Sequence, residues 1–298
     1  MPRPDSMPPH PALQPYARSA QIAGRRLFFY DSDSAPDARP PIVLIHGLGD
    51  EADTWHAVLP ALARWRRVLA LDLPGFGRSE GPRSGATLAF YARTIAELLR
   101  ENGITQAVLV GHSLGAAIVQ RTAIAWPDLA ERLVLIDGGL PIEPRQPPPV
   151  LWLFLTPGLG EAFYTSLRRS QQGAYDTLRP YYYNLDALPE AERAFLRERV
   201  WARVWSSSQR RAFLSTLRWL AIEQVFRAGR YRARLATATT PTTILWGSND
   251  LIAPQAAGAA MAALLPRATL QIIAESGHNV QHEQPQELVR LIEHVLTK

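Results

Sequence analysis

The sequence predicts an α/β fold in which helices cover both faces of a mostly parallel, doubly wound β-sheet. Continuously apolar runs such as residues 41–47 and 132–139 have the length and composition of strands that are buried on both faces. Between these runs lie segments with apolar residues at helical spacing, of which residues 88–102 are a clear example. Regular alternation of such strands and helices is typical of a parallel sheet with helical connections.

The expected elements follow one another along the chain. The proline-rich residues 1–16 predict a flexible N-terminal tail, and residues 19–32 predict a β-hairpin that turns at Gly24. Further strands are expected at residues 41–47, 67–75, 106–113, 132–139, 242–250 and 268–273. Helices are expected at residues 54–65, 88–102, 114–126, 254–265 and 285–296.

A helical segment interrupts the alternation of strands and helices. Residues 140–234 contain no strand-like run, several runs with helical spacing, and more than half of the aromatic residues of the chain. We therefore expect three parts. These are the flexible tail over residues 1–16, an α/β core formed by residues 17–139 and 235–298, and a helical cap, or lid, over residues 140–234.

Composition narrows the class of protein. The chain has no cysteine, which excludes disulfides, thiolate metal sites and a cysteine nucleophile. No apolar run approaches the roughly 18 residues of a membrane span, and the N-terminus lacks the apolar stretch of a secretory signal, so we expect a cytoplasmic protein. The net charge is +5, but the arginines are scattered and Lys298 is the only lysine, so nucleic acid is not an expected partner.

A serine lies between two glycines where an expected strand meets an expected helix. The run Gly111-His112-Ser113-Leu114-Gly115 has the G-x-S-x-G pattern of a nucleophile elbow. The two glycines remove side chains that would collide in such a sharp turn. The turn directs the hydroxyl toward the cleft beyond the strand ends, and the helix N-terminus favours developing negative charge. This placement predicts that Ser113 is a nucleophile.

Two further polar residues are expected at the same edge of the sheet. Asp250 ends the strand-like run 242–250, and His278 follows the next strand, before the last helix. A serine hydroxyl needs a base to become nucleophilic, and the base needs a carboxylate to orient it. The order serine, acid, histidine along the chain fits this architecture. Asp137 also ends a strand on this side and is the alternative acid.

The motifs HGLGD, DLPGFGRS, GHSLG, WGSND and SGHNVQHEQP resemble those of α/β-hydrolase-fold serine hydrolases of the esterase and lipase type. The resemblance covers about residues 20–138 and 238–298. It implies that Ser113 is the nucleophile, that His278 acts first as general base and then as general acid, and that Asp250 orients the histidine.

The resemblance also implies an oxyanion hole built from backbone N–H groups. These groups belong to Leu48, which follows His46-Gly47, and to Leu114, which follows the nucleophile. Each such donor is worth roughly 10²–10³ in rate, because it meets charge that exists only in the transition state. His46 and His112 lie in motifs in which the family uses histidine to brace loops.

The expected function is that of a serine hydrolase with neither metal nor cofactor. His278 and His282 have the i, i+4 spacing of a metal-binding pair, but no third ligand is evident. The favoured activity is that of a carboxylesterase, which cleaves small to medium acyl or aryl esters through an acyl-enzyme. One alternative is hydrolysis of a carbon–carbon bond in vinylogous diketones. Another is a non-catalytic binding protein on a hydrolase scaffold. The sequence does not indicate an oligomeric state.

Overall fold

The computed structural model describes residues 7–33, 39–82, 85–144 and 149–297. Within those ranges, no helix combines the length and the apolar character that a membrane span requires.

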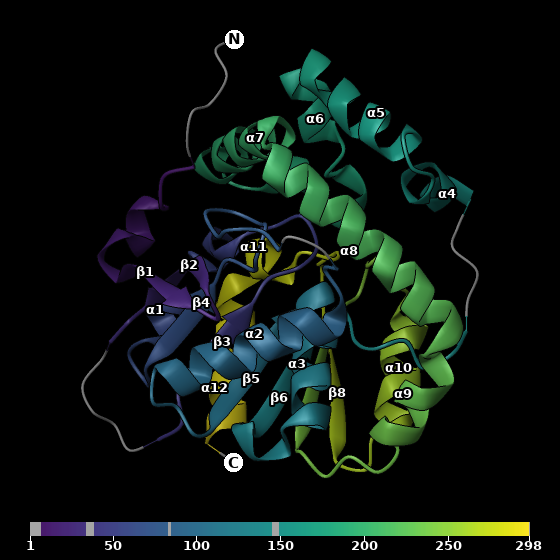
Figure 1. Cartoon of the computed structure of the whole chain (residues 1–298). Coiled ribbons are helices and arrows are strands. Elements are labelled where there is room, and N and C mark those ends of the chain that lie inside the picture. The colour runs from purple at the N-terminus through teal and green to yellow at the C-terminus, as the bar shows by residue number, and fades with distance from the viewer. Residues whose placement is uncertain (1–6, 34–38, 83–84, 145–148, 298) are drawn as a thin grey trace.

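The described residues form one eight-stranded sheet (Figure 1). Its strands are β1 (Ala17–Ile22), β2 (Arg25–Asp31), β3 (Ile42–Ile45), β4 (Val68–Leu71), β5 (Ala107–His112), β6 (Ala130–Ile136), β7 (Thr242–Gly247) and β8 (Ala268–Ile273). Their order is β1-β2-β4-β3-β5-β6-β7-β8. Strand β2 pairs antiparallel with β1 and β4, and the remaining pairs are parallel. The predicted α/β fold with a mostly parallel sheet is confirmed.

Helices connect the strands and fill the interval between β6 and β7. The connecting helices are α1 (Leu59–Leu62), α2 (Leu88–Glu101), α3 (Leu114–Ala125), α10 (Gln255–Leu264), α11 (Val280–Glu283) and α12 (Pro285–Leu296). The interval holds α4 (Pro149–Leu155), α5 (Leu159–Ser166), α6 (Gln171–Asp176), α7 (Glu190–Trp205), α8 (Ser207–Phe226) and α9 (Ala228–Leu235). Short 3₁₀-helices are η1 (Pro11–Tyr16), η2 (Ala52–Trp55), η3 (Pro127–Leu129), η4 (Leu167–Arg169), η5 (Arg179–Tyr181) and η6 (Leu185–Ala187).

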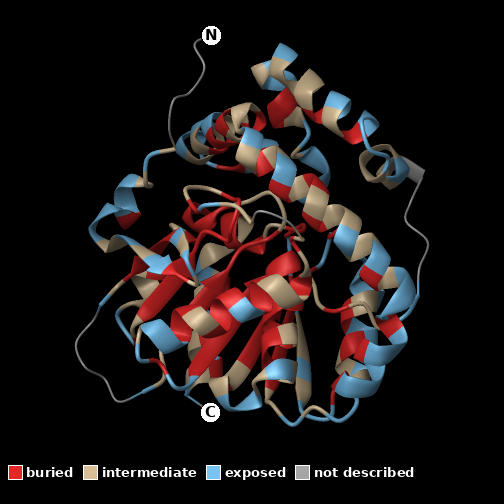
Figure 2. Cartoon of the chain, in the orientation of Figure 1, coloured by how far each residue is buried: buried red, intermediate tan, exposed pale blue. Residues whose placement is uncertain are grey.

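The strands place alternate side chains in two hydrophobic clusters, one on each face of the sheet. In β3, Val43 and Ile45 join one cluster, whereas Leu44 joins the other. The first cluster is covered by α2, α3 and α10, and the second by α1 and α12. Figure 2 shows that the central strands are buried, whereas exposed residues lie on the outer surfaces of the helices, in loops and on the edge strands. Burial on both faces explains why these strands read as continuous apolar runs.

Two expectations about the N-terminal part are wrong. Within the expected flexible tail, residues 11–16 form η1, whose Leu13 is fully buried against the core; residues 1–6 lie outside the described residues. The helix expected over residues 54–65 is divided into η2 and the single turn α1. Pro60 lies in the first turn of α1, and because proline lacks a backbone N–H, it favours the start of a helix over its interior.

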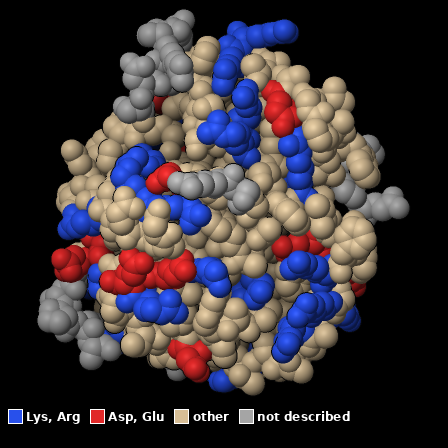
Figure 3. Space-filling model, in the orientation of Figure 1, with Lys and Arg blue, Asp and Glu red and all other residues tan. Residues whose placement is uncertain are grey.

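In the segment between β6 and β7, called the inserted segment below, the described residues form helices and connecting loops, and no strand. In Figure 1 its helices α7 and α8 run across one end of the sheet. Figure 3 shows basic side chains spread over one face of the molecule with acidic side chains between them. On that face the positive charge is therefore not gathered in a single patch.

Candidate active site

Ser113 lies at the sharp turn between β5 and α3. Its backbone has φ 53° and ψ −113°, in a region that residues with a side chain rarely adopt. The turn is held by hydrogen bonds on both sides: the N–H of Ser113 donates to the carbonyl of Ile136 at 2.8 Å, and its own carbonyl accepts from Ala116 at 3.1 Å. The strained conformation is therefore built into the junction of strand and helix.

Glycine is required on both sides of this serine because backbones approach closely. A Cβ on Gly111 would lie 2.3 Å from the carbonyl carbon of Gly115. A Cβ on Gly115 would lie 2.2 Å from the carbonyl oxygen of Ile45. Backbone atoms of a central strand have no room to move aside, so this turn depends on both glycines.

Three polar side chains from separate loops meet at the turn. Nε2 of His278 lies 2.9 Å from Oγ of Ser113, and Nδ1 lies 2.8 Å from Oδ2 of Asp250. The other oxygen of Asp250 accepts the N–H groups of Ile252 and Ala253 at 2.7 and 2.9 Å, which fixes the carboxylate. Because an ionised carboxylate only accepts, Nδ1 carries the proton and Nε2 faces the hydroxyl with its lone pair. This arrangement can activate a serine hydroxyl.

Asp137, the alternative acid, has different partners. Its Oδ1 accepts the N–H of Gly247 at 2.7 Å, and its Oδ2 is buried without a hydrogen-bond partner among the described residues. Burial raises the pKa of the Asp137 carboxyl well above its usual range. The structure thus places Asp250, and not Asp137, against the imidazole of His278.

Of the two residues expected to supply the oxyanion hole, Leu114 directly follows Ser113, and Leu48 follows a glycine that lies close to it. Leu114 is the first residue of α3, and the N–H of such a residue has no acceptor within its own helix. Leu48 follows Gly47, whose position is so close to the serine that a Cβ there would lie 3.3 Å from Cβ of Ser113.

Two histidines brace the loops around the site. Nε2 of His46 accepts the N–H of Leu73 at 3.0 Å, and its Nδ1 donates to the carbonyl of Gly47 at 2.8 Å. Nε2 of His112 donates to the carbonyl of His278 at 2.6 Å. Burial lowers the pKa of both rings, that of His112 to about 3. Both are therefore neutral at physiological pH, and in His46 the N–H that Nε2 accepts requires a neutral ring.

The inserted segment touches the loop that carries His278. The carbonyl of Tyr181 accepts the N–H groups of His278 and Asn279 at 2.9 and 3.2 Å. The Tyr181 ring lies 5.9 Å from the His278 ring, measured between centroids. The sequence showed that this segment is rich in aromatic residues. It could not predict this contact, because a backbone carbonyl makes it and every residue has one.

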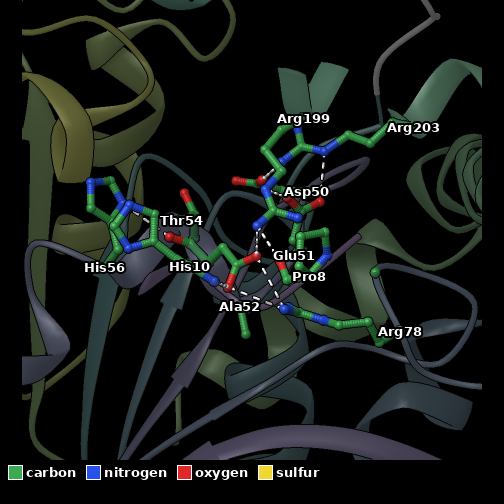
Figure 4. A network of polar contacts seen from close by, with 12 residues as sticks. Pro8, His10, Asp50, Glu51, Ala52, Thr54, His56, Arg78, Arg199 and Arg203 are labelled. Atoms are coloured by element: carbon green, nitrogen blue, oxygen red, sulfur yellow. Dashed lines mark hydrogen bonds and ion pairs between the residues drawn. The ribbon is translucent and has the colours of Figure 1, made fainter. Parts of the chain in front are cut away.

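Charged side chains fasten the inserted segment to the loop that follows β3 (Figure 4). Nη2 of Arg199 on α7 lies 2.8 Å from Oδ2 of Asp53, and Nη1 of Arg78 lies 3.1 Å from the same oxygen. Nε of Arg203 donates to Glu51 at 2.6 Å. These partners are far apart in sequence. The scattered distribution of arginines along the sequence therefore did not predict these ion pairs.

A buried glutamine of α8 makes a second link. Nε2 of Gln209 donates to the carbonyl of Gly49 at 3.0 Å, and its Oε1 accepts the N–H of Gly77 at 3.0 Å. Since Gly49 directly follows Leu48, α8 holds the loop that would supply one oxyanion donor.

Comparison with known proteins is consistent with this geometry. Residues 40–285 match the family model described as alpha/beta hydrolase fold. Over 265 residues the chain is 27% identical to a 2-hydroxy-6-oxononadienedioate/2-hydroxy-6-oxononatrienedioate hydrolase from a Pseudomonas species, covering 86% of this chain and 88% of that protein. It is also 27% identical over 267 residues to the uncharacterized hydrolase YugF of Bacillus subtilis, covering 87% and 90%. The crystal structure of Cfl2 from Burkholderia cenocepacia is similar with a TM-score of 0.79 at 25% identity, covering 94% and 95%.

Proposed function

Since the chain belongs to the α/β-hydrolase fold family, we propose that it is a serine hydrolase that cleaves carboxylic esters through an acyl-enzyme. One observation carries this proposal: His278 lies between Ser113 and Asp250, with Nε2 at 2.9 Å from the hydroxyl and Nδ1 at 2.8 Å from the carboxylate. The strained backbone of Ser113 supports it, because such strain is typical of a nucleophile elbow.

The reaction follows from this geometry. His278 accepts the hydroxyl proton as Oγ of Ser113 attacks the ester carbonyl carbon, and Asp250 stabilises the imidazolium that forms. The N–H groups of Leu48 and Leu114 bind the oxyanion of the tetrahedral intermediate. When the intermediate collapses, His278 gives the proton to the leaving alkoxide and the acyl group stays on Oγ. Water then attacks the acyl-enzyme with the same general base, which releases the carboxylic acid.

The proposed substrate is a small molecule with a small to medium acyl or aryl group. Residues 140–234 would act as the cap that covers the site and selects among such groups. The contact between Tyr181 and the His278 loop supports this, since it places an aromatic residue of the inserted segment beside the imidazole. A cytoplasmic location stays a prediction.

A second candidate is hydrolysis of a carbon–carbon bond in a vinylogous diketone. It is favoured by the 27% identity to the 2-hydroxy-6-oxononadienedioate/2-hydroxy-6-oxononatrienedioate hydrolase over most of both chains. The same three side chains serve either reaction, so the geometry of the triad does not separate them. The third possibility, a binding protein on a hydrolase scaffold, would require that the assembled triad has no catalytic use.

The two activities can be compared on one preparation. Purified protein is assayed with p-nitrophenyl esters from acetate to octanoate and, separately, with a 2-hydroxy-6-oxo-dienoate. We expect kcat/KM to be higher for at least one of the esters than for the dienoate. Both activities should disappear in Ser113→Ala. A higher kcat/KM for the dienoate would replace the ester proposal by the second candidate, and no Ser113-dependent turnover of either would favour the binding protein.

A further inference from the structure

Two histidines and one glutamate form a cluster outside the catalytic triad. Nε2 of His56 lies 2.9 Å from Oε2 of Glu192, and Nδ1 of His282 lies 2.7 Å from Oε1 of the same carboxylate. The three ligand-capable atoms all lie within 4.8 Å of one another. His56 directly follows η2 as its C-cap and His282 belongs to α11, whereas Glu192 comes from α7 of the inserted segment.

The nitrogen of each ring that points away from Glu192 already has a partner. Nδ1 of His56 lies 3.0 Å from the carbonyl oxygen of Asp53, which can only accept, so this nitrogen carries a proton. Nε2 of His282 lies 2.8 Å from Oγ1 of Thr54, which also accepts from the side-chain amide of Gln281 at 3.1 Å. Such partners orient histidines that bind metals through the opposite nitrogen.

This arrangement leaves a place for positive charge. In a neutral ring of His56, Nε2 directs its lone pair at the carboxylate of Glu192. Two acceptors that face each other across 2.9 Å repel unless a proton or a cation lies between them. The same holds for His282: when Nε2 of this ring donates to Thr54, Nδ1 directs its lone pair at the carboxylate of Glu192. A single dication supplies the charge at both contacts.

We propose that His56, Glu192 and His282 bind one divalent transition-metal ion, with Zn²⁺ as the best fit. Two imidazole nitrogens and one carboxylate oxygen form a donor set typical of Zn²⁺, and water completes the tetrahedron. Bonds of about 2.0–2.1 Å separate such ligands by about 3.3 Å. The ligand atoms lie within 4.8 Å of one another, and the two rings face different oxygens of Glu192, so the carboxylate has to turn and the ligand atoms have to shift to share one ion. The side chains of His56 and Glu192 are partly exposed, at 12% and 14%, whereas that of His282 is 3% exposed.

The proposed ion would link the inserted segment to the core beside the active site. Its ligands belong to three elements that no disulfide can join, and α11 begins at Val280, two residues after His278. The metal-binding pair considered in the sequence, His278 with His282, is not this site, because His278 faces Ser113 and Asp250. The inference goes beyond the proposed hydrolysis, and its test does not use ester turnover.

Calorimetric titration with Zn²⁺ tests the site on the full chain after treatment with a chelator. We expect one ion per wild-type chain and a rise of several degrees in Tm when the site is filled. Glu192→Gln keeps the size of the side chain, and we expect it to weaken Zn²⁺ binding at least about 100-fold. Thr54→Val removes the hydroxyl that orients His282 and accepts from Gln281, and it should weaken binding about 10–100-fold. His294→Asn, which changes an exposed histidine on α12, should bind Zn²⁺ like the wild type.

Circular dichroism verifies that each variant is folded. Should a variant fail to fold, Co²⁺ bound to the wild-type chain provides an independent measurement, because four-coordinate Co²⁺ with nitrogen ligands gives intense visible absorption. Absence of stoichiometric binding by the wild type would overturn the proposal and leave a hydrogen-bonded bridge of two histidines and a glutamate. Binding that persists unchanged in folded Glu192→Gln would overturn it as well, since the ion would then lie elsewhere.

Discussion

Arg203 donates a hydrogen bond from Nε to Oε2 of Glu51 across 2.6 Å, and the same guanidinium reaches the carboxylate of Asp50 (Figure 4). The side chain of Glu51 is fully buried and that of Arg203 is 13% exposed. Arg203 lies on α7, whereas Asp50 and Glu51 follow Leu48 by two and three positions. A helix of the inserted segment is therefore tied to the loop that we propose supplies an oxyanion donor.

Replacing Arg203 by glutamine should destabilise the fold strongly. The substitution leaves the buried carboxylate of Glu51 without its main counter-charge, and breaking a buried pair in this way costs about 3–5 kcal/mol. Urea unfolding at neutral pH measures the loss. Arg197→Gln is the control on the same helix. Arg197 makes a 4.0 Å contact with the exposed Glu190 and lies 5.0 Å above the centre of the Tyr175 ring, and together these should contribute about 1 kcal/mol. Equal losses in the two variants would contradict this account.

Asp50 should make stability fall in acid. Burial alone would raise the pKa of Asp50. The charge of Arg203, together with smaller contributions from His282, His46 and a hydrogen bond to Thr54, outweighs burial and lowers this pKa from 3.8 to about 2. A carboxyl with a lowered pKa stabilises the fold fully above its unfolded pKa and loses that contribution as the pH falls through the folded value. We expect the stability advantage of wild type over Asp50→Asn to shrink by about 1 kcal/mol between about pH 6 and pH 3, and by about 2 kcal/mol on full protonation. Urea unfolding across this range would refute the prediction if the advantage stayed constant.

Asp250 and Asp137 should respond differently to the same substitution. Asp250→Asn removes the acceptor that orients Nδ1 of His278, so we expect kcat for the preferred ester to fall by about 10⁴-fold. Asp137→Asn should keep kcat within a few-fold, because Asp137 makes no hydrogen bond to the imidazole and accepts from Gly247 instead. Steady-state kinetics of both variants test this, and a larger loss in Asp137→Asn would identify residue 137 as the acid.

Asp137→Asn should also keep or raise the stability at neutral pH. Burial raises the pKa of Asp137, so the folded chain keeps a proton on this carboxyl at a pH where the unfolded chain has lost it. Above the ordinary carboxyl pKa, this difference in bound protons lowers the stability of the fold as the pH rises. Asparagine needs no proton and tolerates the φ of 49° at this position. Unfolding in urea at pH 7 provides the measurement, and a loss above about 1 kcal/mol would speak against it.

Gly115→Ala should prevent normal folding of the turn. The added methyl group would lie 2.2 Å from the carbonyl oxygen of Ile45, so we expect a loss of at least about 4 kcal/mol or no soluble protein. Gly229→Ala on α9 is the control, because its Cβ would meet nothing within 4 Å and alanine favours a helix by about 1 kcal/mol. A Gly115→Ala chain with wild-type stability, measured by thermal unfolding, would show that the turn has more room than described.

The sequence predicted those features that depend on short stretches of chain. The apolar runs of β3 and β5 could be recognised because strands buried on both faces are continuously apolar, and Ser113 because its glycines lie two positions away on either side. Asp250 and His278 followed from the rule that parallel strands present their ends at one edge.

Features that depend on packing between distant segments could not be predicted. Leu13 is buried only because η1 packs on a core formed by later residues. The partners of Arg203 lie more than 150 positions earlier in the chain. The cluster of His56, Glu192 and His282 could not be predicted, because the three residues come from different parts of the chain and share no sequence motif.

Labelling with a fluorophosphonate tests the central claim most directly, because such a probe reacts with a serine only when its hydroxyl has been made nucleophilic. Peptide mass spectrometry should locate one label per chain on Ser113, no label in Ser113→Ala, and greatly slowed labelling in His278→Gln. A chain that takes no label, or that is labelled equally well without the hydroxyl of residue 113, would contradict the account.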